Sequence, residues 1–128
     1  MTKIVIADDE TAVLSSTGAI LKVFGFEVAT VAIARDILPV LLTERPDLLL
    51  QDARMPGLDL VEHLKAIRGE ETLADLPVLV FTANVDAEEV WKNVGADGVV
   101  EKPFNPRELK ALIEKHLAAK GRSPTAEE

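Results

Sequence analysis

The sequence contains no cysteine, which excludes disulfide bonds, thiolate catalysis and cysteine-based zinc sites without fixing a cellular compartment. Basic residues are scarce: 14 lysines and arginines stand against 22 acidic residues, and the formal net charge is −8. Because recognition of a phosphate backbone needs a basic face, we expect no direct binding of nucleic acid. A metal cation or a basic patch on a partner protein suits this charge better.

Long hydrophobic runs are also absent. No run approaches the ~20 apolar residues of a membrane-spanning helix. The N-terminal MTKIVIADDE carries acids where a signal peptide would have its apolar segment,. We therefore expect a cytoplasmic protein that does not enter the membrane. Apolar residues make up 48% of the 128 residues, which suits one folded domain with a substantial core.

Short apolar runs alternate with longer stretches of helical periodicity. The runs have strand length and are rich in valine, isoleucine and leucine; they cover residues 4–7, 27–31, 48–50, 78–81 and 99–100. Apolar residues recur at helical spacing between them, as in Leu60, Leu64 and Ile67. Five βα units with continuously apolar strands predict a doubly wound α/β fold around a five-stranded parallel sheet.

Local signals mark several helix ends. Asn105, followed by a proline, predicts the start of the last helix, and Asp59 and Asp86 each stand three residues before a glutamate, as helix caps do,. Pro39 lies inside an otherwise helical stretch, so that helix either begins late, near Asp36, or is kinked. We expect one domain over residues 1–119 and a loose polar tail over residues 120–128.

Polar side chains stand where four of the predicted strands end. These residues are Asp8, Asp9, Asp52, Thr82 and Lys102. The carboxyl ends of parallel strands share one edge of the sheet, so we expect these side chains to converge. Two carboxylates ~4 Å apart repel by about 4 kcal/mol at an effective dielectric of about 20, and a divalent cation removes that repulsion. Oxygen ligands without histidine or cysteine favour Mg²⁺, with Mn²⁺ as the second choice.

The lysine and the threonine add a second kind of chemistry. Lysine is a compact charge suited to phosphate oxygens, and a threonine hydroxyl donates a hydrogen bond. A carboxylate, a cation, a lysine and a hydroxyl together are the components of phosphoryl transfer to an aspartate. Taken singly they are weak signals: Asp8 and Asp9 would also suit a helix cap, and Asp52 would suit a turn before Met55.

The sequence contains four motifs, in the order ADDE, LLLQDARMPGLD, VLVFTA and GADGVVEKPF. In this order and at this spacing, they together resemble the response regulator receiver domain of two-component signalling. The resemblance covers residues 1 to about 119 and implies the flavodoxin-like strand order 2-1-3-4-5. It also implies a phosphorylation-dependent switch that catalyses only its own phosphorylation and dephosphorylation, either stand-alone or excised from a longer protein.

The resemblance implies a role for each matching residue. Asp52 would accept a phosphoryl group from a histidine kinase or phosphotransfer protein. Asp9 would bind Mg²⁺ directly, Asp8 through water, and Asp52 and the backbone carbonyl of Arg54 would be further ligands. The phosphoryl group would bind to Thr82, Ala83 and Lys102. The Lys102–Pro103 peptide bond would be cis.

The sequence departs from the family pattern at the switch. Val99 stands where the family commonly has tyrosine or phenylalanine, so we expect signalling to depend on Thr82 and the loop at Ala83 and Asn84, with Trp91 as the aromatic substitute. Asn84 and Arg54 occupy the positions that tune hydrolysis of the acyl phosphate in the family, and we predict a slow to moderate phosphoryl lifetime.

The family's usual output face consists of the fourth helix, the fifth strand and the fifth helix, so a downstream protein or a second copy of the chain would bind there. On this sequence, Glu10 would either join the acidic site or stabilise the helix that follows it. Trp91 and Phe104 are expected to serve packing more than signalling, although both would lie near the output face. His63 and His116 fall on helix faces, where we expect them to be solvated and without a role.

Three other interpretations stay open. A Mg²⁺-dependent phosphatase of the haloacid dehalogenase type also uses an aspartyl nucleophile, but it places a DxD motif after the first strand, and ADDE lacks that spacing. A flavodoxin-like cofactor binder needs a phosphate loop there, where the acidic pair would repel phosphate. A pseudo-receiver that only binds partners would not be phosphorylated at all.

Overall fold

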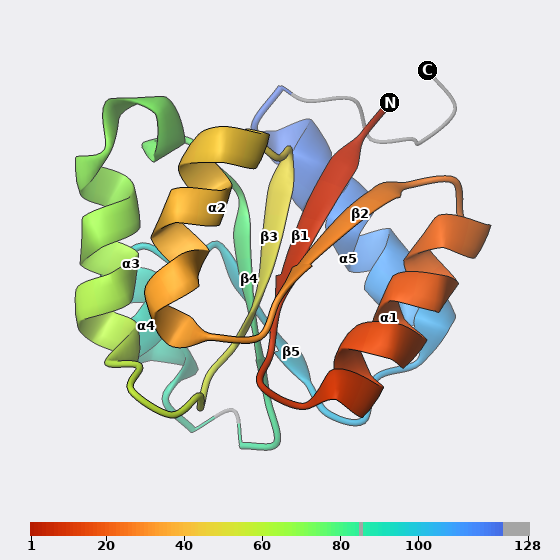
Figure 1. The fold of residues 1–128 in the computed structure, drawn as a ribbon, viewed down its shortest axis with the longest axis horizontal. Coiled ribbons are helices and arrows are strands. Elements are labelled where there is room, and N and C mark those ends of the chain that lie inside the picture. Colours follow the sequence, from red (N-terminus) through yellow and green to blue (C-terminus); the bar gives the residue numbers. More distant parts are fainter. Residues whose placement is uncertain (85, 122–128) are drawn as a thin grey trace.

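The computed structural model describes residues 1–84 and 86–121. Within these residues, the strands form a single parallel sheet in the order β2-β1-β3-β4-β5 (Figure 1). The strands are β1 (Lys3–Ala7), β2 (Glu27–Val31), β3 (Leu48–Asp52), β4 (Val78–Thr82) and β5 (Gly98–Glu101). The predicted fold class and strand order are therefore confirmed.

The α-helices lie on both faces of the sheet. They are α1 (Thr11–Val23), α2 (Ile37–Glu44), α3 (Leu60–Gly69), α4 (Glu88–Asn93) and α5 (Pro106–Ala119), with short 3₁₀ turns η1 (Ala34–Asp36) and η2 (Glu71–Leu73). Helices α1 and α5 cover one face, and α2, α3 and α4 cover the other (Figure 1). Because both faces are covered, every residue of β3 and β4 is buried, which explains why the strands read as continuous apolar runs.

Two hydrophobic cores lie on opposite sides of the sheet, because successive strand residues point to opposite faces. On the side of α2, α3 and α4, Val5, Leu49 and Val80 belong to one buried cluster. On the side of α1 and α5, Leu50 and Phe81 belong to the other. The alternation continues to the end of β3, where Gln51 and Asp52 are the last two residues.

The predicted helix starts agree with the structure at two of three positions. The Asn105 side chain caps α5 and accepts hydrogen bonds from two backbone N–H groups of its first turn. Asp59 caps α3 by accepting a hydrogen bond from the backbone of Glu62, at 3.2 Å. The prediction for Asp86 is wrong: α4 begins at Glu88 with Ala87 as its N-cap.

The third start differs because a local turn precedes α4. The backbone N–H of Asp86 donates to the side-chain oxygen of Asn84, at 2.9 Å, and an aspartate or asparagine side chain that bonds two residues onward makes a turn. The helix therefore begins later than the cap-plus-acid spacing indicates. Pro39 lies in the first turn of α2, where a helix tolerates proline. The late start is thus the correct alternative, with Asp36 as the N-cap.

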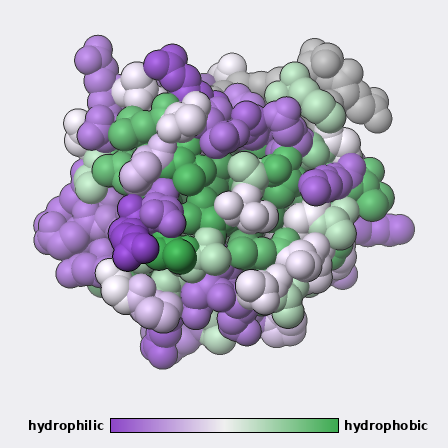
Figure 2. Space-filling model, in the orientation of Figure 1, coloured by the Kyte–Doolittle hydropathy of each residue, from purple (hydrophilic) through white to green (hydrophobic). Residues whose placement is uncertain are grey.

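The surface of the described residues is mixed in polarity. In the view of Figure 2, hydrophobic residues gather in the middle of the face and hydrophilic residues surround them. No described helix has the length and apolar character needed to cross a membrane. The predicted polar tail lies outside the described residues from position 122 onward; its first residue, Lys120, forms an ion pair with Asp97 at 3.3 Å.

Candidate functional site

The predicted site residues lie at the edge of the sheet formed by the carboxyl ends of the strands, at the bottom of Figure 1. Asp8 directly follows β1, Asp52 ends β3, Thr82 ends β4 and Lys102 directly follows β5. Asp8 is 0% exposed, and Asp52 and Thr82 are each 6% exposed. The fold therefore holds these polar side chains on rigid strand ends, where most of them are shielded from water.

Three carboxylates gather at this edge. One oxygen from each of Asp8, Asp9 and Asp52 lies within 4.8 Å of the others. Asp8 and Asp52 are buried and Asp9 is exposed. Neither Asp8 nor Asp9 is the N-cap of α1, because that position belongs to Glu10. Asp8 instead accepts a hydrogen bond from the backbone N–H of Glu10, at 2.9 Å, which fixes the loop between β1 and α1.

Lys102 supplies positive charge to this cluster. Its Nζ donates to Asp52 Oδ1 at 3.0 Å and to Asp8 Oδ2 at 3.1 Å. Burial raises the pKa of Asp52, and the hydrogen bond from Lys102 opposes that effect. Burial lowers the pKa of Lys102, but hydrogen bonds and charge from Asp52 and Asp8 outweigh it and raise the pKa overall. The lysine is therefore held as a cation between two buried carboxylates.

A pocket opens beside the ammonium–carboxylate pair. Its lining consists of Glu10, Asp52, Ala53, Arg54, Thr82, Ala83, Asn84 and Lys102. The Thr82 hydroxyl donates to the backbone oxygen of Asn84 at 2.8 Å and accepts from its N–H at 3.0 Å. The threonine is thus coupled to the loop that leads into α4.

The segment after β5 packs against the end of the sheet. The Lys102–Pro103 peptide bond is cis. Phe104 makes an edge-to-face contact with Phe81, with ring centroids 5.8 Å apart. Lys102 Nζ also lies 5.3 Å from the Phe81 ring centroid. The Phe81 ring therefore lies next to the lysine, and Phe104 packs against Phe81 as predicted.

Two predicted switch residues lie outside the pocket. Trp91 and Val99 are partly buried and pack against the core cluster that includes Leu64 and Val80. Neither of them lines the pocket next to Asp52. Trp91 and Val99 therefore belong to the hydrophobic packing between α4 and the sheet, outside the pocket next to Asp52.

Sequence reasoning missed a buried polar pair beneath the site. Gln51 is 0% exposed, and its Oε1 lies 2.9 Å from His63 Nε2. The prediction that His63 and His116 are solvated is wrong, because both are partly buried and burial lowers the pKa of each, that of His63 to about 4. The overlooked signal was a glutamine in an apolar strand run, together with a histidine between Leu60 and Leu64 on the apolar face of a helix.

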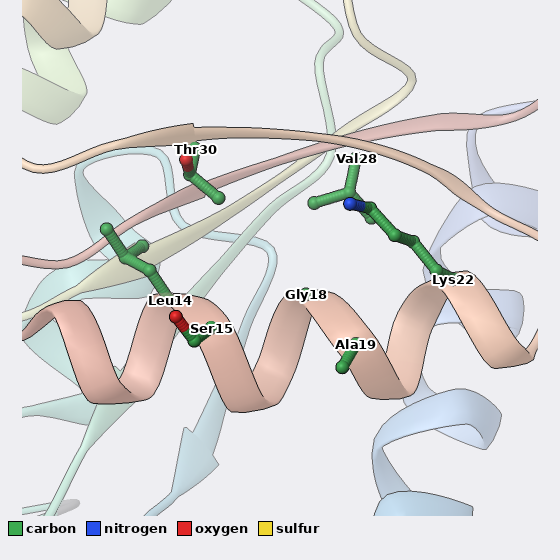
Figure 3. Close-up of a pocket in the computed structure, with 7 residues that line it drawn as sticks. All are labelled: Leu14, Ser15, Gly18, Ala19, Lys22, Val28 and Thr30. Atoms are coloured by element: carbon green, nitrogen blue, oxygen red, sulfur yellow. The ribbon is translucent and has the colours of Figure 1, made fainter.

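Another pocket lies between α1 and β2, away from the acidic cluster. Figure 3 shows small and apolar side chains around it, including Leu14, Gly18 and Val28. None of its lining residues has a carboxylate, and Lys22 is the one charged residue in the lining. It therefore lacks the oxygen ligands that a hard cation requires.

Comparison with known proteins assigns the chain to a family. The model of the response regulator receiver domain matches residues 4–114. The chain belongs to this family. Response regulator receiver domains act as signalling modules in two-component systems, so the chain is a signalling protein by family. This places the acidic cluster and its lysine within a receiver domain.

Individual receiver domains and their parent proteins show the extent of the likeness. The phosphate regulon transcriptional regulatory protein PhoB of Pseudomonas aeruginosa is 30% identical over 92% of this chain and 52% of its own length. The chain thus spans about half the length of the curated relatives it matches. A CheY-like receiver domain from Methanospirillum hungatei superposes with a TM-score of 0.86 at 32% identity, covering 94% of this chain and 97% of that one.

A third comparison concerns a receiver domain with metal. The receiver domain of a sensor histidine kinase from Pseudomonas aeruginosa superposes with a TM-score of 0.84 at 25% identity, covering 91% of this chain and 98% of that one. That structure has a magnesium ion coordinated in the active site cleft.

Proposed function

We propose that this receiver domain is a phosphorylation-dependent switch whose phosphoacceptor is Asp52. The phosphoryl group would come from a phosphohistidine on a histidine kinase or phosphotransfer protein. The observation that carries the proposal is the contact of Lys102 Nζ with both Asp52 and Asp8, at 3.0 and 3.1 Å, beside an open pocket. A nucleophilic carboxylate next to a fixed cation is the arrangement that phosphoryl transfer to aspartate requires.

The transfer forms one bond and breaks one bond. A carboxylate oxygen of Asp52 attacks phosphorus, the P–N bond to the donor imidazole breaks, and the imidazole leaves with that electron pair. The ammonium of Lys102 offsets the negative charge on the phosphoryl oxygens. Because Asp52 ends a strand whose five residues are all buried, its carboxylate is held in place while the group arrives.

The acidic cluster suits a hard divalent cation. We propose that Asp8, Asp9 and Asp52, with the backbone carbonyl of Arg54, hold Mg²⁺, and that Mn²⁺ substitutes for it. Three carboxylate oxygens within 4.8 Å of one another, with no histidine or cysteine in the set, fit that choice. When bound, the cation supplies charge neutralisation at the phosphoryl oxygens. The related receiver domain with a magnesium ion in its active site cleft supports this assignment.

Thr82 links phosphorylation to the output face. The hydroxyl that now bonds to Asn84 would turn to the phosphoryl group, which the backbone of Ala83 and the ammonium of Lys102 would also bind. Losing two hydrogen bonds frees the loop that enters α4. Trp91 and Val99 pack between that helix and the sheet, so we propose that they transmit the change to a partner, or to a second copy of the chain, at the face of α4, β5 and α5.

Arg54 bears on how long the phosphoryl group survives. It is exposed and lines the pocket beside Asp52, so its side chain would shield the acyl phosphate from water. We expect Arg54→Ala to shorten the lifetime of the phosphorylated protein about threefold, an effect of roughly 0.6 kcal/mol on the barrier. An unchanged dephosphorylation rate would remove this role.

The decisive experiment is intact mass after incubation with acetyl phosphate, with and without Mg²⁺. We expect one phosphoryl adduct on the wild type that requires Mg²⁺ and is lost in Asp52→Asn. Asp75→Asn, which changes an exposed carboxylate outside the cluster, is the matched control and should be phosphorylated normally. A folded wild type without an adduct would favour a pseudo-receiver, and turnover of a phosphomonoester would favour a phosphatase.

A further inference from the structure

A buried hydrogen-bond relay lies directly beneath the candidate site. Gln51 immediately precedes Asp52 and is 0% exposed. Its Nε2 donates to the backbone oxygen of Asp52 at 3.0 Å and to Met55 Sδ at 3.4 Å. Its Oε1 lies 2.9 Å from His63 Nε2 on α3. One amide therefore connects the phosphoacceptor strand, the loop that follows it and the helix beyond.

Hydrogen-bond chemistry fixes the direction in which the amide points. The backbone oxygen of Asp52 can only accept a hydrogen bond, so the amide nitrogen of Gln51 faces it and the amide oxygen faces His63,. An amide oxygen also only accepts, so the neutral ring in this arrangement carries its hydrogen on Nε2 and donates it to Gln51. This hydrogen bond holds the glutamine with its N–H groups directed toward Asp52 and Met55. Burial, which holds the pKa of His63 at about 4, keeps the ring neutral at physiological pH.

Packing alone does not account for this pair. The neighbours of Gln51 and His63 on the same side of the sheet are apolar and buried, including Leu49, Leu60 and Leu64. Two apolar side chains would fill this space without the cost of burying an amide and an imidazole. The two hydrogen bonds that Gln51 donates reach Asp52 and Met55. These residues are the two ends of the short segment that contains Arg54.

We propose that Gln51 is a positioning residue that holds the segment from Asp52 to Met55 in the shape required for cation binding, and that His63 holds Gln51. The inference rests on the proposed function, in which the carbonyl of Arg54 and the carboxylate of Asp52 are ligands. A tether at both ends of this short segment restricts the carbonyl between them before the cation arrives. Groups that orient metal ligands in this way typically affect metal affinity about 10- to 100-fold.

The test is direct titration of the purified protein with Mn²⁺ by calorimetry, which needs no phosphorylation. We compare the wild type with Gln51→Leu, His63→Leu and the double variant. Gln51→Leu leaves the buried His63 N–H without its acceptor, whereas the double variant removes both polar groups and restores an apolar core. We expect the Mn²⁺ dissociation constant to rise roughly tenfold in Gln51→Leu and in the double variant, and less in His63→Leu.

The control is Leu49→Met, a volume-conserving change on the same face of β3, which should leave Mn²⁺ affinity unchanged. A second measurement is the rate of phosphorylation by acetyl phosphate as Mg²⁺ is varied. If Gln51 positions the cation site, the double variant needs more Mg²⁺ to reach half of its maximal rate, while the maximal rate stays within about twofold of wild type. A general loss of structure would lower the maximal rate as well as the apparent affinity for Mg²⁺.

The two proposals fail in different ways. A stable double variant that binds Mn²⁺ as tightly as the wild type would overturn the positioning role and leave the cation site intact. A wild type that binds no Mn²⁺ would overturn the cation site and the inference with it. If Gln51→Leu alone does not fold, the double variant still decides the question.

Discussion

Replacing Lys102 with methionine tests the electrostatics of the site most directly. The ammonium lies between Asp8 and Asp52, and the side chain of Asp8 is fully buried. Methionine keeps most of the length of the side chain but removes its charge. Lys102→Met therefore leaves two neighbouring carboxylates that repel each other without a cation between them, and we expect the folded state to become less stable in EDTA.

The expected loss follows from the burial of the partners. Breaking a buried ion pair by removing one member typically costs about 3–5 kcal/mol. The Lys102 side chain is 23% exposed, so solvent screening lowers that figure, and we expect the free energy of unfolding to fall by roughly 2–3 kcal/mol. In a chain of this size each kcal/mol corresponds to about 3–5 °C, so the melting temperature should fall by roughly 10 °C.

Mg²⁺ should compensate for the missing charge. In the wild type a cation competes with the ammonium for the same carboxylates, whereas in Lys102→Met the ammonium no longer competes for them. A ligand at a hundred times its dissociation constant stabilises the folded state by about 2.7 kcal/mol. We therefore expect Mg²⁺ to stabilise the variant more than the wild type and to bring the two close together, even though the variant cannot support the proposed role of Lys102 in phosphorylation.

The assay is urea denaturation followed by Trp91 fluorescence, in EDTA and in Mg²⁺. Lys92→Met is the matched control, because Lys92 pairs with Glu88 on the surface of α4, where such a pair contributes about 0.3–0.5 kcal/mol,. The reasoning is refuted if Lys102→Met is as stable as the wild type in EDTA, or if Mg²⁺ stabilises both proteins equally.

Three further predictions concern stability. The pKa of His63 is about 4 in the folded protein, below its ordinary 6.5, so the unfolded chain takes up the proton more readily. The free energy of unfolding should therefore fall by roughly 3 kcal/mol as the pH drops from about 6.5 to about 4. His63→Leu should remove this part of the pH dependence, measured by urea denaturation at the two pH values. If the variant lost as much stability between them as the wild type, the prediction would be contradicted. Arg68 donates to the carbonyls of Gly95, Leu73, Ala74 and Leu76 and to the Asp97 carboxylate, so Arg68→Met should cost about 3 kcal/mol. The control Arg35→Met, at an exposed arginine, should change the free energy of unfolding by under about 0.5 kcal/mol. Equal losses in the two variants would show that the hydrogen bonds of Arg68 do not stabilise the fold. Asn105→Ala should cost about 1 kcal/mol, because two N–H groups of α5 lose their cap,; an unchanged denaturation midpoint would show that the cap is not needed.

The order of the elements could be predicted because it depends on local patterns. Apolar runs covered on both faces predicted a parallel sheet, and the caps at Asn105 and Asp59 predicted two helix starts. The start of α4 was missed because the Asn84 side chain makes a turn with Asp86. Asparagine and aspartate favour such turns as much as helix caps, so the sequence alone does not distinguish the two.

The convergence of the site was also predictable, since parallel strands end at a common edge. The positions of the predicted strand ends placed four polar residues together, and the structure brings all four to one edge of the sheet: Asp8, Asp52, Thr82 and Lys102. The contact of Lys102 with two carboxylates at once was not predictable. It depends on the relative heights of three strand ends and on the Phe81–Phe104 contact behind the lysine.

By itself, the sequence determined the alternation of strands and helices, the strand ends that carry polar residues, and the resemblance to a family, because each of these is written in local periodicity and in motif spacing. Tertiary structure alone decided which buried polar groups meet. Gln51 and His63 belong to different elements, and their pairing follows from how α3 packs on β3. Arg68 similarly joins the end of α3 to Gly95 and Asp97, which lie beyond the next strand. A side-chain hydrogen bond requires two groups within about 3 Å, and packing alone sets distances at that scale.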